Sequence, residues 1–236
     1  MRMLKNAFIR ARQVLRSEGP LSLARRTAAY VRLRSRRLYF KRDCYLYRHH
    51  VIARESARYL PRLDSYELRI LESEEQADEL AAEGYEDFRL RFLASSRNLL
   101  LGAVGVLVFV DKKIVHMGWV AMDFRAQPCA DPLPLRVAFD DGEACTGGTY
   151  TVPEYRGKGL MGYGYYERFE YLRSKGYKFT RNTVETHNVA SQRVHAKFSP
   201  EVLGTGHFIR VLWWSRWVEH PFPDGPHIGM PPAVTR

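Results

Sequence analysis

A basic, glycine-rich turn at residues 153–161, PEYRGKGLM, has residue types suited to holding an anion. The segment before it, EACTGGTYTV, is typical of a strand, and residues 159–174 have the apolar spacing of a helix. Backbone amides at a helix N-terminus attract anions, and glycine lets a phosphate come close to them. No Walker pattern GxxxxGK[ST] is present. The turn therefore predicts a phosphate site, although a plain tight turn explains the same glycines.

A second motif, NVASQRVHAKFSP, follows downstream between a predicted strand and a short predicted helix. The two motifs together resemble those of the GNAT superfamily of acyl-CoA-dependent N-acyltransferases, over roughly residues 65–219 in order of elements. The turn matches the family's phosphate loop from Val152 and Pro153 through Gly159. In the second motif, the residues that match are Asn188, Ser191 and Lys197.

The sequence departs from the family pattern at three places. Met161 stands where the phosphate loop usually has Gly or Ala, so that one backbone contact is open to question. His195 occupies the position of the usual Tyr, and Ser199-Pro200 replaces Gly-Phe.

The resemblance implies that residues 156–161 hold the pyrophosphate of acetyl-CoA or another acyl-CoA. It also implies that strand 149–152 splays from strand 177–185, so that the thioester lies between them. A backbone N–H near Val152 would then donate to the thioester oxygen, where negative charge develops. The implied donor-binding residues are Tyr150, Thr151, Val152, Arg156, Gly157, Lys158, Gly159, Leu160, Met161, Asn188 and Ser191. For Asn188, a simple helix N-cap is the alternative role.

Direct attack by an amine needs a base for the ammonium and a donor for the leaving thiolate. His195 is at the family's thiolate-donor position and could also act as a base, and a packed helix histidine is the alternative. Glu185, at the end of a predicted strand, is our candidate base. Glu143 and His187 are the other candidates, whereas Asp140 and Asp141 are expected in a DDG turn.

The predicted fold class is α/β (α+β): a mixed, mostly antiparallel GNAT-like sheet flanked by helices, with a basic helical N-terminal extension. Expected strands include 65–71, a hairpin around the turn 111–113, 135–139 and the region 207–220. We divide the chain into a basic amphipathic arm (1–60), an acyltransferase domain (61–220) and a Pro/Gly-rich tail (221–236).

The basic charge is concentrated at the N-terminus. The formal net charge is +11, and residues 1–50 hold fourteen Lys/Arg against only Glu18 and Asp43. Apolar residues in the arm recur at helical spacing. We expect residues 1–42 to dock on an anionic membrane surface. A helical hairpin packed on its own domain and an arm that binds nucleic acid are the alternatives.

The cysteines, Cys44, Cys129 and Cys145, are scattered, with no CxxC pair and no metal-ligand spacing, so no metal is expected. The N-terminus lacks the apolar core of a signal peptide, and the longest apolar run, 99–110, is shorter than the roughly 20 residues of a membrane span. We therefore expect a cytoplasmic protein, with peripheral attachment to the inner face of the membrane as a further expectation.

The sequence predicts an N-acyltransferase, most simply an N-acetyltransferase, that acts on a small-molecule or lipid-linked amine. An amino sugar of a lipid-linked or cell-envelope saccharide precursor is our specific hypothesis. A FemAB-like aminoacyl-tRNA-dependent transferase and a non-catalytic CoA-binding adaptor are the alternatives. Trp213, Trp214 and Trp217 belong to the core, the acceptor cleft or a membrane interface. The acceptor, the acyl length and the oligomeric state stay open.

Overall fold

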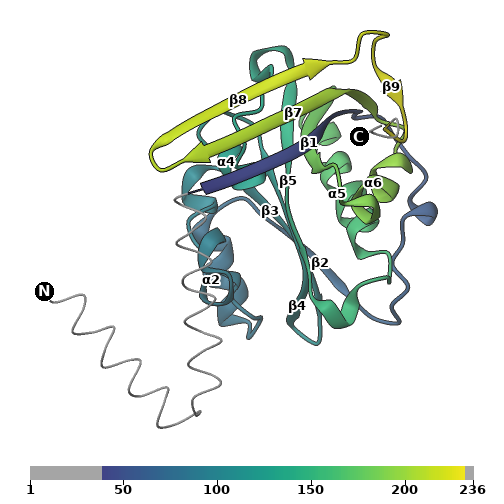
Figure 1. Ribbon diagram of the computed structural model, residues 1–236. Coiled ribbons are helices and arrows are strands. Elements are labelled where there is room, and N and C mark those ends of the chain that lie inside the picture. Colours follow the sequence, from purple (N-terminus) through teal and green to yellow (C-terminus); the bar gives the residue numbers. More distant parts are fainter. Residues whose placement is uncertain (1–38, 232–236) are drawn as a thin grey trace, which may run out of the picture. The chain divides into compact units, whose positions relative to one another are not determined.

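The computed structural model describes residues 39–231 (Figure 1). Apart from residues 39–60, the predicted arm lies outside the described residues. Within residues 39–231 the strands form one sheet in the order β2-β3-β4-β5-β6-β1-β7-β8, and β9 pairs with β7. The strands are β1 Tyr39–His50, β2 Glu67–Leu71, β3 Val104–Val110, β4 Lys113–Ala121, β5 Glu143–Thr151, β6 Phe179–Glu185, β7 Glu201–Val211, β8 Trp214–Pro221 and β9 His227–Ile228.

The helices are α2 Glu74–Ala82, α3 Phe88–Arg91, α4 Gln127–Ala130, α5 Leu160–Ser174 and α6 Val189–Ala196. The chain divides into two compact units. Residues 43–206 and 218–231 belong to the larger unit, and residues 39–42 and 207–217 belong to the smaller one. No helix among residues 39–231 is long and apolar enough to cross a bilayer.

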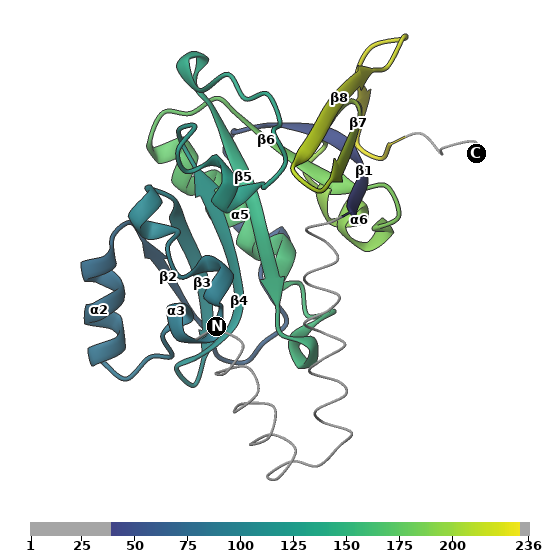
Figure 2. The same cartoon turned by 60° about the vertical axis from the view of Figure 1, so that its left-hand side comes forward.

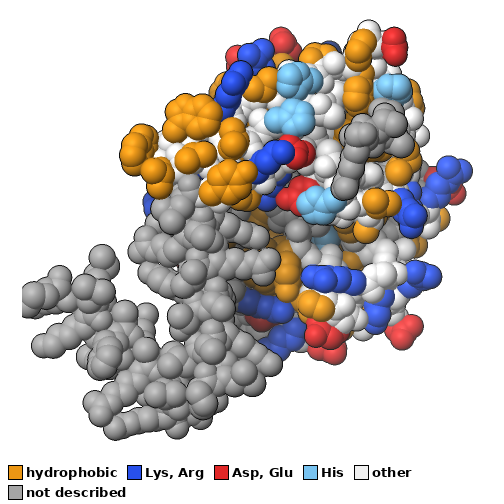
Figure 3. Space-filling model, viewed as in Figure 1, with side chains coloured by type: hydrophobic (Ala, Val, Ile, Leu, Met, Phe, Trp, Pro, Cys, Tyr) orange, Lys and Arg blue, Asp and Glu red, His pale blue; other side chains and the backbone are white. Residues whose placement is uncertain are grey.

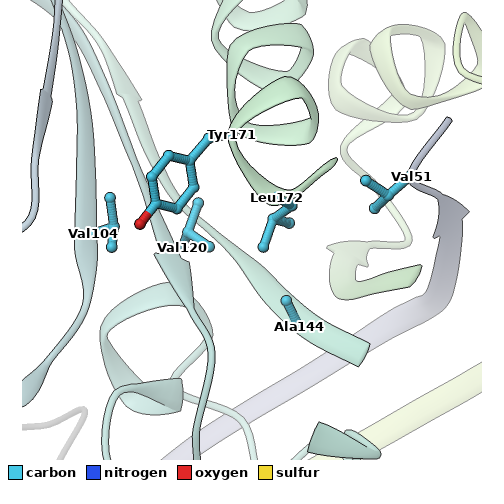
Figure 4. Close-up of a cluster of buried hydrophobic side chains, with 6 residues drawn as sticks. All are labelled: Val51, Val104, Val120, Ala144, Tyr171 and Leu172. Atoms are coloured by element: carbon cyan, nitrogen blue, oxygen red, sulfur yellow. The ribbon is translucent and has the colours of Figure 1, made fainter. Parts of the chain in front are cut away.

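In the larger unit, helices cover both faces of the strands β2 to β5 (Figure 2). On one face, Tyr171 and Leu172 of α5 pack against Val104, Val120 and Ala144 (Figure 4). On the other, the ring of Phe88 in α3 meets the Trp119 ring edge-to-face at 5.3 Å. Because both faces are covered, β3 and β4 are almost continuously apolar rather than alternating.

Several elements begin or end where local sequence signals predict. The Ser73 hydroxyl accepts from the Gln76 amide and caps α2, and Gly176 follows α5 with φ of 83°. The expected hairpin of β3 and β4 turns on two residues rather than three: Asp111 and Lys112 have positive φ, as a type I′ turn requires, and Lys113 already pairs with Val110.

The expected fold class, a mixed and mostly antiparallel sheet flanked by helices, is confirmed. Two local expectations are wrong. The sequence predicts a helical arm through residue 60, but residues 39–50 are the strand β1, which pairs antiparallel with β6. The segment 135–139 contains no strand: its Leu135 and Val137 are buried without a ladder, and a 3₁₀ turn follows at Phe139–Asp141.

Candidate functional site

The two strands predicted to splay do separate. Strands β5 and β6 run parallel and pair only through Glu143, Ala144 and Cys145, and the last pair joins Cys145 to Arg181. Beyond it, β5 continues to pair with β4 as far as Thr151. The β5 edge from residue 146 onward therefore has no β6 ladder among the described residues, and its backbone groups can pair with an extended ligand.

A bulge in β5 lies at the start of this open edge. The register with β4 shifts between Met117 and Trp119: Trp119 pairs with Gly147 and Met117 with Tyr150, so the two residues Gly148 and Thr149 lie opposite one residue of β4. A Cβ on Gly147 would lie 2.3 Å from the Ala130 carbonyl oxygen, and Gly148 has φ of 54°. Glycines are therefore required at both positions, because the strand turns there against the closely packed helix α4.

The predicted phosphate turn lies between β5 and α5, and Arg62 determines its orientation. The Arg62 backbone N–H donates to the Lys158 carbonyl at 2.8 Å, and its Nη2 donates to the Gly157 carbonyl at 2.6 Å. In a trans peptide the C=O and the following N–H point in opposite directions. The amides of Lys158 and Gly159 therefore point away from Arg62, and no described residue accepts from them.

These outward amides continue into the N-terminus of α5, which begins at Leu160 after Gly159 with φ of 86°. Gly157 also has positive φ, and a Cβ there would meet nothing within 4 Å, so the turn is open on its outer side. Such a series of amides at a helix N-terminus fits a pyrophosphate. The glycines at 157, 159 and 162 also have the GxGxxG spacing of dinucleotide loops, which hold the same chemical group.

The departure at Met161 does not obstruct the turn. Its side chain packs against the buried cluster of Tyr165, Phe169 and Phe198 on the inner side of α5. Arg156 is exposed, and its Nε donates to the Thr151 carbonyl at 3.3 Å. The positive charge of Arg156 is thus kept beside the end of the open β5 edge.

The amide expected to serve the thioester oxygen is already used. The Val152 N–H donates to the Val115 carbonyl of β4 at 3.0 Å. Successive residues of a strand direct their N–H groups to opposite edges. The Thr151 amide therefore faces the side of β6, and Thr151 replaces Val152 as the donor that the geometry offers.

Asn188 adopts the role of an N-cap. Its Oδ1 accepts from the Ser191 amide at 3.1 Å at the start of α6. Gln192 secures the same corner, because its Nε2 donates to the carbonyls of Glu185 and Thr186. Sequence analysis did not identify Gln192, although its place one turn after Asn188 is a signal for this corner.

The candidate bases separate into two groups. Glu185 and His187 meet at the end of β6, with Oε2 and Nε2 3.0 Å apart, and the imidazole side chain is 80% exposed. Glu143 is 3% exposed, and its carboxylate pairs with the Nε atoms of Arg48 and Arg181 at 3.2 and 3.0 Å. Glu143 is therefore committed to holding strands together, whereas the Glu185–His187 pair faces solvent.

His195 lies fully buried at the end of α6. Its Nδ1 is 3.0 Å from His49 Nε2, and its Nε2 is 3.3 Å from Asn182 Nδ2. Burial, together with the nearby charge of Arg168, lowers the pKa of His195 to about 3. The imidazole is therefore neutral near pH 7, and both ring nitrogens have partners in the core.

Arg168 of α5 is also fully buried, and it joins the helix to β5. Its Nη1 donates to the Gly147 carbonyl and Thr149 Oγ1 at 3.1 and 3.2 Å, and its Nε donates to the Gly164 carbonyl at 2.9 Å. The guanidinium also stacks 3.8 Å from the Tyr165 ring centroid. Arg168 thus holds β5 in place next to α5, at the residues where β5 no longer pairs with β6.

Two glycines make room for this polar layer beneath α5. A Cβ on Gly118 of β4 would lie 2.6 Å from Arg168 Nη1, and one on Gly164 would lie 2.4 Å from His116 Nε2. His116 Nδ1 in turn is 2.7 Å from Thr151 Oγ1. Burial, with Arg168 nearby, lowers the pKa of His116 to about 3. Arg168 and His116 were missed by sequence analysis because both look like ordinary surface residues.

No protein-family model and no curated protein matches this sequence. Solved structures do match. A putative GNAT-family acetyltransferase from Novosphingobium aromaticivorans is 16% identical over 71% of this chain and 64% of that chain, with a TM-score of 0.41. A GCN5-related N-acetyltransferase from Sphaerobacter thermophilus is 14% identical over 83% and 58%, with a TM-score of 0.45. A conserved protein of unknown function from Staphylococcus epidermidis is 12% identical over 76% and 66%, with a TM-score of 0.45.

The described residues form the mixed, mostly antiparallel sheet flanked by helices that the GNAT resemblance implies. The splayed parallel pair, the glycine turn before α5 and the capped corner before α6 occur in the order that the two sequence motifs imply. The chain spans less than two thirds of the length of these three solved structures. The likeness to them concerns the fold alone.

The buried histidines predict that the fold loses stability in mild acid. Their pKa in the folded state, about 3 for His116 and His195, lies below the ordinary 6.5. The unfolded chain therefore binds more protons than the folded one between these values, so stability is full above pH 6.5 and falls as the pH is lowered. At pH 5 the loss is about 2 kcal/mol for each histidine. Urea unfolding across this pH range measures it.

The matched variants are His116→Asn and His195→Asn, which remove the titrating groups. Each should lower stability at pH 7 and flatten the decline below pH 6.5. Asn98→Ala, which removes a buried polar side chain that does not titrate, should leave the shape of the pH profile unchanged. An unchanged slope in both core variants would show that other groups cause the acid sensitivity.

Proposed function

We propose that this protein is an acyl-CoA-dependent N-acyltransferase, acetyl-CoA being the simplest donor. The observation that carries the proposal is the pair of outward amides of Lys158 and Gly159, before the N-terminus of α5 and beside the β5 edge that lacks a β6 ladder. The turn suits the pyrophosphate, and the strand edge suits the amides of a pantetheine arm. With the pyrophosphate on the turn, an extended arm along β5 would bring its thioester between β5 and β6.

The reaction would be direct transfer. A neutral amine attacks the thioester carbonyl carbon, the C–S bond breaks, and coenzyme A leaves as a thiolate. The Thr151 amide would donate to the carbonyl oxygen while it carries negative charge. The excess proton of the amine passes to a base, and the thiolate takes a proton from a donor or from water.

We assign the base to the Glu185–His187 pair. The pair is at the end of β6, on the strand that faces the open edge of β5, and both groups are accessible. Imidazole is a common general base, and a carboxylate that contacts one ring nitrogen fixes the orientation of the ring. In this arrangement Glu185 acts through His187 or through water.

The thiolate-donor role of His195 stays a prediction, and the geometry sets the condition for it. The imidazole has no solvent exposure, and its ring nitrogens contact His49 and Asn182. To protonate the sulfur, His195 would have to exchange one of these contacts for the ligand and receive a proton back through the other. His195→Phe tests this by its effect on kcat, compared with its effect on the unfolding free energy.

The acceptor is an amine, and we propose an amino sugar of a lipid-linked saccharide as the first substrate to test. The support is the concentration of basic residues before residue 50, which suits a substrate presented at an anionic surface. The intact phosphate turn favours acyl-CoA over the aminoacyl-tRNA alternative, because a tRNA donor has no need of it. Retained CoA binding without turnover on any amine would instead support the adaptor alternative.

Binding of coenzyme A should depend on the turn and on Arg62. In wild type, CoA at a hundredfold excess over its dissociation constant should stabilise the fold by about 2.7 kcal/mol. Gly159→Asp should abolish the shift, because a carboxylate would meet the phosphate. Arg62→Ala should weaken binding by about tenfold, because one of two bonds that orient the amides is lost. Thermal denaturation with CoA measures both.

Arg58→Ala is the control for Arg62→Ala, because it removes a nearby exposed arginine whose ion pair within residues 39–231 is with Glu55. It should bind CoA as the wild type does. Absence of any shift with millimolar CoA in wild type would contradict the proposed function.

Replacement of the base should lower turnover and leave CoA binding unchanged. We expect His187→Ala to reduce kcat by about 10²-fold or more, and Glu185→Gln to reduce it less while altering the pH profile. The assay measures free thiol released from acetyl-CoA with an amine panel. Equal kcat in both variants and wild type would remove the pair from the mechanism.

A further inference from the structure

The smaller unit, residues 39–42 and 207–217, ends in an apolar tip. We define the tip as residues 211–214, where β7 turns into β8. Trp213 is 90% exposed, Trp214 51%, Leu212 45% and Val211 41%. The other large apolar side chains exposed within residues 39–231 stand singly in the sequence. Figure 3 shows hydrophobic side chains gathered at this end of the hairpin.

The residues at the turn of the tip are not those that would be most stable in this backbone conformation. Leu212 and Trp213 form the two-residue turn between β7 and β8, and Leu212 has φ of 57°. Two-residue hairpin turns with positive φ favour Gly, Asn or Asp, because a bulky side chain is strained there. The chain therefore keeps two large apolar residues at the apex despite a local conformational cost.

Basic residues flank the tip. Arg210 precedes it on β7, Arg216 follows it on β8, and both are exposed. With Lys41 and Arg42, residues 39–42 and 207–217 hold four basic residues and no acidic one. Inside this unit the rings of Phe40 and Phe208 meet edge-to-face at 5.9 Å, and Arg210 lies over the Phe208 ring. The apolar residues beneath the tip thus have partners, whereas those of the tip face solvent.

We propose that the tip inserts into the interface of an anionic lipid bilayer. Tryptophan prefers the boundary between headgroups and acyl chains, and flanking arginines reach anionic headgroups. The tip lies far in sequence from the basic arm, and the proposal for it does not depend on CoA binding at the glycine turn. It supplies an apolar contribution to membrane binding that salt does not screen.

The aliphatic pair Val211 and Leu212 favours a lipid over a nucleic acid. Proteins that bind single-stranded nucleic acid stack bases on aromatic rings and place basic groups on phosphates, and aliphatic side chains take part in neither contact. A protein groove is the other apolar partner, and vesicles without protein distinguish it. The vesicle experiment below distinguishes a lipid surface from a nucleic acid and from a protein groove.

The test measures co-sedimentation of the full-length protein with phosphatidylcholine vesicles that contain or lack phosphatidylglycerol. Leu212→Gly is the most informative variant, because glycine adopts the positive φ without strain and also removes apolar surface. We expect its thermal midpoint to stay equal or rise while its affinity for anionic vesicles falls. Trp213→Ser should lower affinity by tenfold or more, because about 100 Å² of buried apolar surface corresponds to that range.

Salt separates the two contributions to binding. In 1 M salt the Debye length is about 3 Å, so attraction through the basic residues is suppressed. The residual binding should then require the tip. Leu90→Ser and Phe124→Ser are matched controls, because they remove side chains that are 81% and 68% exposed elsewhere in the chain. Both should bind vesicles as the wild type does.

Tryptophan fluorescence reports the tip directly. The emission lost in Trp213→Phe should be that of a solvent-exposed indole without vesicles, and it should shift to the blue and be quenched by brominated lipid when they are added. An emission already shifted without lipid would mean that another part of the chain or a second copy covers the tip, and would overturn the proposal.

Three further results would overturn the proposal. The first is that the protein does not co-sediment with anionic vesicles. The second is that Leu212→Gly and Trp213→Ser bind these vesicles as tightly as wild type. The two variants could instead lose binding to tRNA while vesicle binding is unchanged, which would favour nucleic acid. CoA stabilisation should be the same in all tip variants, so failure of this proposal and failure of the acyltransferase proposal are distinguishable.

Discussion

The burial of one guanidinium between α5 and β5 determines much of the larger unit. A buried charge is costly unless it is hydrogen-bonded. Arg168 donates three hydrogen bonds, to the carbonyls of Gly147 and Gly164 and to the hydroxyl of Thr149. All three acceptors lie at the helix or at the bulged strand. The arginine therefore holds β5 close to α5 at the place where β5 leaves β6.

The same burial explains why the surrounding residues are small or neutral. Gly118 and Gly164 leave space for the two polar side chains beneath the helix, and a methyl group at either position would collide with them. His116 and His195 stay uncharged beside the arginine, since burial and like charge both lower their pKa. A helix that looks merely amphipathic in sequence thus covers a polar layer as well as an apolar one.

The sequence was most informative where chemistry and turn geometry are local. The glycine turn, the Asn188 corner and the limits of α5 follow from residues within a few positions of one another. The strand β1 could not be predicted in this way, because its basic residues continue the pattern of the preceding segment and its partner strand is more than a hundred residues away in the chain. Likewise, the roles of Arg62 and Arg168 arise from contacts that no spacing encodes.

The position of β1 has a consequence for how the protein is made. It is the first described strand to leave the ribosome, yet its partner β6 spans Phe179–Glu185 and pairs with it from Cys44↔Glu185 to His50↔Phe179. Until that segment is synthesised, the apolar run from Cys44 to Tyr47 has no ladder to join. Pairings between distant segments form slowly, and strand edges that wait for them are prone to aggregate. The nascent chain must therefore stay soluble through most of its translation, and chaperones have their longest opportunity to bind at this strand.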